Sequence, residues 1–135
     1  MTGDAGFPRA LEAFVARFNA GAFWESHEVL EGPWRERRSP FYHGLILCAS
    51  AFVHAQRGNR HGVRAQLAKA ERRLRRFRPA YLGIDVDGLL AAAAAVADAV
   101  ETGRPAPFPR LALRAAHRRG DEPEAAPLEP PRAEA

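Results

Sequence analysis

The fold is decided largely by residues 18–34, which read FNAGAFWESHEVLEGPW. Within this stretch one imidazole and three carboxylates alternate with aromatic residues at helical spacing. Taking a carboxylate out of water without a partner costs several kcal/mol, so His27, Glu28 and Glu31 must point outward, satisfy one another or hold a ligand. The stretch therefore predicts a helix and, on it, a candidate polar site.

Apolar residues on the N-terminal side of this stretch also recur at helical spacing. They lie at i, i+3, i+4 and i+7 and predict a helix over residues 8–19: Leu11, Phe14, Val15 and Phe18. Gly21 is placed to take the left-handed conformation that ends this helix before a second begins near Ala22. Pro33 has no backbone N–H and its ring crowds the carbonyl of Val29, so we expect the second helix to end or kink there.

Three further helices are expected downstream. The first covers residues 40–57 and ends at Gly58-Asn59, where Asn59 is suited to cap the next helix. That next helix stops at Pro79, and its apolar stripe consists of Val63, Leu67, Ala70, Leu74 and Phe77. The last helix begins at the N-cap residue Asp85 and continues through an alanine run to about residue 101.

The predicted fold class is all-α, with about five helices in antiparallel hairpins that form a compact orthogonal or bundle-like array. We expect this helical domain to occupy residues 1–103. Residues 104–135 lose the helical periodicity among proline, arginine, alanine and glutamate, so this tail is expected to be mostly disordered. A short helix over residues 111–118 could dock Leu111 and Leu113 on the bundle.

Length and cysteine content indicate the cellular setting. A chain of 135 residues can bury one core without disulfides, and Cys48 is the only cysteine, which fits a reducing cytoplasm. Cys48 lies on an apolar helix side and is predicted to be a small core residue. No secretory start is visible, and no apolar run approaches the about 20 residues that span a bilayer. We therefore expect a cytoplasmic protein with no membrane association.

The formal net charge of +4 raises the question of a nucleic-acid partner. All basic residues except Lys69 are arginine, a bias that GC-rich codons alone would produce. The arginines of residues 57–78 spread over the whole arc outside the apolar stripe, and no stacking aromatic residue is evident beside them. The sequence therefore does not favour nucleic acid as a partner.

The opening stretch resembles a known family through the motif Phe18-Asn19-x-Gly21-x-Phe23-Trp24-Glu25-x-His27-Glu28-x-Leu30-Glu31-x-x-Trp34. This is similar to the motif of domain-of-unknown-function family 309. Further matches extend over roughly residues 8–100, namely Gly44-Leu45-Ile46, Ala49, His54, Gly58-Asn59, Lys69-Ala70 and Tyr81-x-Gly83-Ile84-Asp85. The resemblance implies a compact all-helical prokaryotic protein without an established activity. Family members usually carry glutamine where this chain has His43 and Leu47, so a polar site shared by the family would be altered here.

The candidate site can extend from the second helix to the third. Helical spacing brings His27, Glu28 and Glu31 within about 6 Å of one another. One face of the third helix is formed by His43, Leu47, Ser50 and His54. If that face meets the second helix, the metal ligands would be His27, Glu31 and His54, a set that suits Zn²⁺, Mn²⁺ or Fe²⁺. The pattern departs from the zincin motif because Glu31 stands where that motif has its second histidine.

Three interpretations of this cluster stay open. It is a structural network in which His27 and His54 are held by carboxylates or backbone carbonyls, a ligand site, or a set of solvated carboxylates. For a ligand site, the candidate binding residues are Trp24, His27, Glu28, Glu31, Trp34 and His54. Glu28 is the candidate general base if the protein is an enzyme, but no nucleophile motif accompanies it, so that question stays open.

Two functional hypotheses follow. In the first, the protein binds a divalent metal or a small polar ligand at the His/Glu cluster between the second and third helices. In the second, it is a non-catalytic interaction module that uses its arginine-rich fourth helix to bind an acidic protein or RNA, and the cluster is structural. Self-association is open in both. The aromatic residues Phe14, Phe23 and Trp24 are expected in the core, with Trp34 lining a cleft beside Gly32-Pro33.

Overall fold

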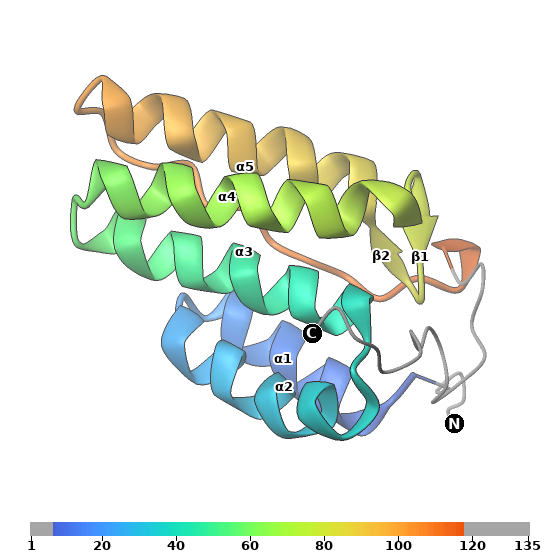
Figure 1. Ribbon diagram of the computed structural model, residues 1–135. Coiled ribbons are helices and arrows are strands. Elements are labelled where there is room, and N and C mark those ends of the chain that lie inside the picture. Colours follow the sequence, from blue (N-terminus) through green and yellow to red (C-terminus); the bar gives the residue numbers. More distant parts are fainter. Residues whose placement is uncertain (1–6, 118–135) are drawn as a thin grey trace.

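The computed structural model describes residues 7–117, in which five α-helices follow one another through short connections (Figure 1). They are α1 (Arg9–Asn19), α2 (Phe23–Arg37), α3 (Pro40–Gln56), α4 (Arg60–Leu74) and α5 (Val86–Glu101). A 3-10 turn, Arg75–Phe77, follows α4, and the two short antiparallel strands β1 (Ala80–Tyr81) and β2 (Ile84–Asp85) precede α5. A second 3-10 turn covers Ala115–His117. The predicted all-α class is confirmed.

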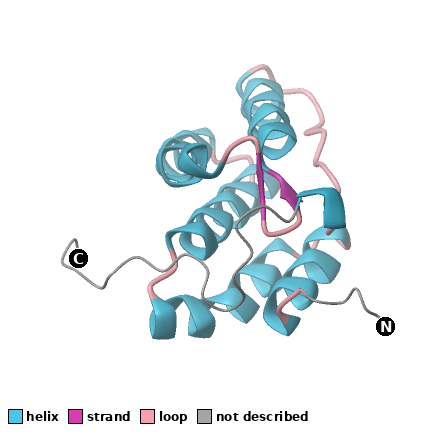
Figure 2. Cartoon of the chain, turned by 90° about the vertical axis from the view of Figure 1, so that its right-hand side faces the viewer, coloured by secondary structure: helices cyan, strands magenta, loops and turns pink. Residues whose placement is uncertain are grey.

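Helix α3 occupies the centre of the fold. It is apolar on almost every side, and a helix of that kind must be covered by neighbours. The hairpin of α1 and α2 covers it from one side, and α4 and α5 cover it from the other (Figure 1). Figure 2 shows the two strands at the end of the bundle that faces right in Figure 1. The expected antiparallel pairing of helix 1 with 2 and of helix 3 with 4 is therefore confirmed.

Helix starts follow the local side-chain chemistry. Asn59 caps α4 as predicted, because its side chain accepts a hydrogen bond from the Gly62 N–H at 3.0 Å. Asp85 caps α5 in the same way through Gly88. Ser39, which the sequence analysis did not assign, caps α3 by accepting the Tyr42 N–H.

Helix α2 corrects one expectation. It does not end at Gly32-Pro33, where an end or a kink was expected, but continues to Arg37. The Arg38 N–H then bonds to the carbonyl of Trp34, and Arg38 takes a left-handed conformation with φ 54°. Tertiary contacts of Trp34 with the next helix hold this last turn in place, and they outweigh the hydrogen bond that Pro33 cannot donate.

Residues 104–117 of the predicted tail pack against the bundle. Phe108 lies 4.9 Å from the ring of Phe23 and 5.3 Å from that of Phe52, centroid to centroid. Leu111 is buried, as predicted, and its backbone forms two hydrogen bonds with the Asn19 side chain. The expected helix over residues 111–118 is replaced by extended chain and a 3-10 turn. The remainder of the predicted tail, residues 118–135, lies outside the described residues.

None of the helices within residues 7–117 combines the length and the apolar character needed to cross a membrane.

Cys48 lies in the core, as predicted, with 1% of its surface exposed. Burial raises the pKa of its thiol to about 12, so the reactive thiolate is absent at neutral pH. We expect the native protein to resist modification by a disulfide reagent such as dithionitrobenzoate, and the unfolded chain to react at its single thiol. Absorbance of the released thiophenolate measures this. Rapid labelling without denaturant would contradict the buried position.

Candidate functional site

Helix α2 presents a stripe of aromatic and ionisable residues beside α3. Trp24, His27, Glu31 and Trp34 are three, four and three residues apart, a spacing that keeps them on one side of the helix. The adjoining side of α2 is buried through Phe23, Ser26 and Leu30, and Trp34 also packs against this core. The opening motif of the sequence therefore divides between a core face and an accessible face.

Trp24 is exposed rather than part of the core. Its neighbour Phe23 is 1% exposed, whereas Trp24 is 52% exposed. The indole stacks on the imidazole of His27, with centroids 5.0 Å apart and ring planes 26° from parallel. The Nδ1 atom of His27 is buried and has no hydrogen-bond partner among the described residues. The prediction that Trp24 is a core anchor is wrong, because Phe23 takes the core-facing position and Trp24, about 100° further round the helix, faces solvent.

A second tryptophan-histidine stack joins α2 to α3 and α4. The rings of Trp34 and His43 lie 4.4 Å apart and 13° from parallel. The guanidinium of Arg38 lies over Trp34, 5.3 Å from the ring centroid. On α4, Arg73 donates from Nε to His43 Nδ1 at 3.0 Å. We call these four residues, Arg38, Trp34, His43 and Arg73, the Trp34 stack.

The hydrogen bond to His43 defines the state of its ring. Nδ1 can accept only when it carries no proton, so the imidazole in this arrangement is neutral and protonated at Nε2. The charged groups of the stack are then the two guanidiniums, one at each end. A ring pair flanked by arginines keeps two cations at fixed positions on the surface.

The predicted metal ligands do not meet. His54 faces α4, where its Nδ1 lies 3.0 Å from Asn59 Nδ2 and its ring packs on Gly62. Glu31 accepts a hydrogen bond from Arg35 at 2.8 Å. Glu28, the candidate general base, is exposed. Among residues 7–117, no three His, Cys, Asp or Glu side chains are grouped so that they could hold a metal ion.

The polar face of α3 is shared between its two neighbours. His43 contacts both α2 and α4, whereas Ser50 accepts a hydrogen bond from Gln66 of α4 at 2.9 Å and His54 packs on Gly62. The sequence analysis considered the case in which this face meets helix 2. The structure turns most of it toward α4, because Gly62 and Gln66 leave room for it there.

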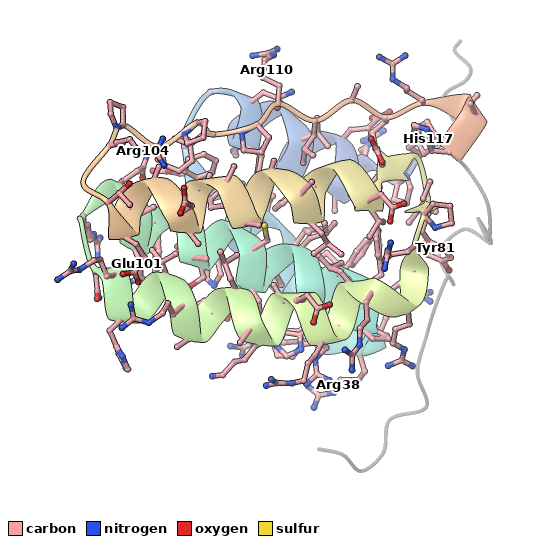
Figure 3. All side chains as sticks on the ribbon, turned by 90° about the horizontal axis from the view of Figure 1, so that it is seen from above. Arg38, Tyr81, Glu101, Arg104, Arg110 and His117 are labelled. Atoms are coloured by element: carbon pink, nitrogen blue, oxygen red, sulfur yellow. The ribbon has the colours of Figure 1, made fainter. Side chains whose placement is uncertain are left out.

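Two ion pairs involve arginines of α4 and of the 3-10 turn that follows it: Arg64 with Glu101, and Arg75 with Glu71 at 3.7 Å. Lys69, Arg72 and Arg73 are exposed within little more than one helical turn, and Arg73 bonds to His43 of α3. Arg38 is connected to Arg73 through the Trp34 stack, and Figure 3 shows Arg38 at an edge of the molecule. We call Arg38, Lys69, Arg72 and Arg73 the basic face.

The fold and site together define a small five-helix protein with a basic, aromatic surface across α2, α3 and α4. Residues 11–66 match the family described as Domain of unknown function (DUF309), so this segment is similar to that family. The match confirms the resemblance inferred from the motif. It includes both tryptophan-histidine stacks, whereas Arg73 and α5 lie outside it. No curated protein matches the chain.

The contact between His54 and Gly62 gives a prediction for a structural role of His54. A Cβ added at Gly62 would lie 2.4 Å from His54 Nδ1, so Gly62→Ala forces the imidazole out of its site. We expect a loss of about 1–3 kcal/mol of unfolding free energy, measured by urea denaturation.

Gly32→Ala is the matched control, because its Cβ meets no atom within 4 Å and alanine favours a helix interior. This variant should be as stable as the wild type or more stable. The double variant His54→Ala/Gly62→Ala should recover part of the loss. If Gly62→Ala and Gly32→Ala behave alike, His54 does not occupy the described position.

Proposed function

We propose that the protein binds single-stranded RNA through the basic face and the two tryptophan-histidine stacks. The observation that carries the proposal is the Trp34 stack, which combines aromatic rings with two guanidiniums on one surface. This is the interaction-module hypothesis of the sequence analysis, now with specific residues. The stacking aromatic rings that the sequence did not reveal beside the arginines come from α2 and α3.

The guanidiniums supply phosphate contacts. Arg73 uses Nε for His43, which leaves its two terminal nitrogens without a hydrogen-bond partner among residues 7–117. Such a guanidinium can donate two parallel hydrogen bonds to one phosphate. Lys69 and Arg72 add positive charge on the same side of α4, and Glu71, the acid nearest to them in sequence, is paired with Arg75. The basic face therefore favours a chain of phosphates.

Trp24 supplies a surface for a base. Its indole is fixed by stacking on His27 and is still 52% exposed. Trp24 and Trp34 are ten residues apart, about 15 Å along α2, a length that a few nucleotides can follow. Basic grooves with aromatic side chains at intervals are the usual means of binding single strands. An acidic peptide would use the arginines but would gain nothing from Trp24.

The metal and small-ligand hypothesis is the weaker of the two. It required His54 beside His27 and Glu31, and each of these three side chains has a separate neighbour: Asn59, Trp24 and Arg35 respectively. Their arrangement supports a structural role for His54 and a surface role for His27.

The test is fluorescence anisotropy with a labelled single-stranded RNA of mixed sequence at several salt concentrations. We expect affinity to fall as salt rises, and the double variant Arg38→Gln/Arg73→Gln to bind more weakly with a flatter salt dependence. Each lost phosphate contact should reduce the slope of log K against log salt by about 0.7.

Arg64→Gln serves as the matched control, since Arg64 lies on the α5 side of α4 in an ion pair with Glu101. It should leave the salt slope nearly unchanged. Polyglutamate should compete poorly with RNA. Equal competition by polyglutamate and RNA would indicate an acidic protein partner instead. Equal RNA affinity of Arg64→Gln and of the double variant Arg38→Gln/Arg73→Gln would refute the basic face as the binding surface.

Trp24→Ala tests the base-stacking step separately. We expect it to weaken RNA binding by about 5- to 150-fold, which corresponds to about 1–3 kcal/mol for one stacked base. The melting temperature should change little because the side chain is largely exposed. Trp24→Phe should keep part of the affinity. A Trp24→Ala variant with wild-type affinity would show that no base stacks on this indole.

A further inference from the structure

An apolar groove runs between α4 and α5, on the side of α4 away from the basic face. Its volume is about 400 Å³, and Cys48, Leu67, Leu90 and Ala94 are among the residues that line it. Arg64 and Glu71 are the charged residues of its lining. Figure 3 views the molecule from this side, with α4 and α5 running next to each other. The groove is distinct from the surface proposed to bind RNA.

Helix α5 lacks the polar face of a surface helix. Residues 88–97 contain only glycine, leucine, alanine and valine, although Ala91, Ala94 and Ala95 are exposed. An accessible helix normally carries polar side chains on its outer side, whereas a helix that is apolar all round is normally covered. The outer face of α5 and the groove beside it therefore form one apolar surface.

We infer that a second copy of this chain covers this surface and forms a two-fold symmetric dimer. In such a dimer the same surface of both copies meets itself, so its charges must be complementary to themselves. Arg64 lies at one end of the groove lining and Glu71 lies seven residues away, about 10 Å along α4. A two-fold axis across the groove places Arg64 of each copy over Glu71 of the other copy.

Side-chain size and internal ion pairs fit this arrangement. Alanine at positions 91, 94 and 95 lets the two α5 helices approach closely, so each can enter the groove of the other copy. Arg64 and Glu71 are already held by Glu101 and Arg75, and the dimer extends these pairs into a four-residue network at each end. An unrelated partner would not need this self-complementary charge order.

Sedimentation equilibrium of the full chain over a wide concentration range is the test. We expect a reversible monomer-dimer equilibrium, abolished by Ala94→Glu, which places a bulky carboxylate in the groove. Ala16→Glu is the matched control, with the same substitution at an exposed helical alanine of α1, outside the groove lining. It should dimerise measurably better than Ala94→Glu. Circular dichroism checks that both variants are folded.

Charge reversal tests the symmetry. Arg64→Glu alone and Glu71→Arg alone should each raise the dimer dissociation constant about tenfold, since each places like charges opposite one another twice. A mixture of the two variants should form heterodimers, and the double reversal should dimerise like the wild type. A wild-type chain that stays monomeric would overturn the inference, as would a dimer that Ala94→Glu and Ala16→Glu affect equally.

Discussion

The apolar surface of α3 is the constraint on which the rest of the structure depends. Nearly every residue from Pro40 to Val53 is buried, so this helix cannot face water on any broad side. Two hairpins must cover it, and the short connections before and after α3 dictate that α2 and α4 are its direct neighbours. The few polar residues of α3 are therefore left in the narrow strip between those two helices.

That strip explains the position of the Trp34 stack. The α2–α3 connection lies at Arg38 and Ser39, so Trp34 and His43 are almost equally far from the turn and lie level in the antiparallel pair. Seven residues before Trp34 and seven residues after His43, the same antiparallel register places His27 level with Ser50. The Ser50 hydroxyl accepts a hydrogen bond from Gln66. The stacked rings and the arginines thus lie along one strip beside the core, and Trp34 also packs against the core.

Local chemistry was predictable from the sequence, and long-range choices were not. Asn59 and Asp85 cap their helices because their side chains bond to backbone groups three residues away. By contrast, Phe23 and Trp24 are adjacent aromatic residues, and periodicity alone does not say which of them enters the core. Similarly, the direction of the His54 side chain depends on the absence of a side chain at Gly62. Gly62 lies eight residues further along the chain but is adjacent to His54 in space.

Helix α4 carries the two proposed surfaces at different positions around its axis. It exposes Lys69, Arg72 and Arg73, which suit a polyanion, and the acidic residue between them in the sequence, Glu71, is paired with Arg75. Toward α5 it pairs Arg64 with Glu101 and Glu71 with Arg75, which neutralises the rim of an apolar groove. Since Arg73 lies about 180° round α4 from Arg64, a dimer through the groove would leave Arg73 of both copies accessible. Two copies would then present two strand-binding surfaces, and one strand bound to both would gain avidity from the dimer.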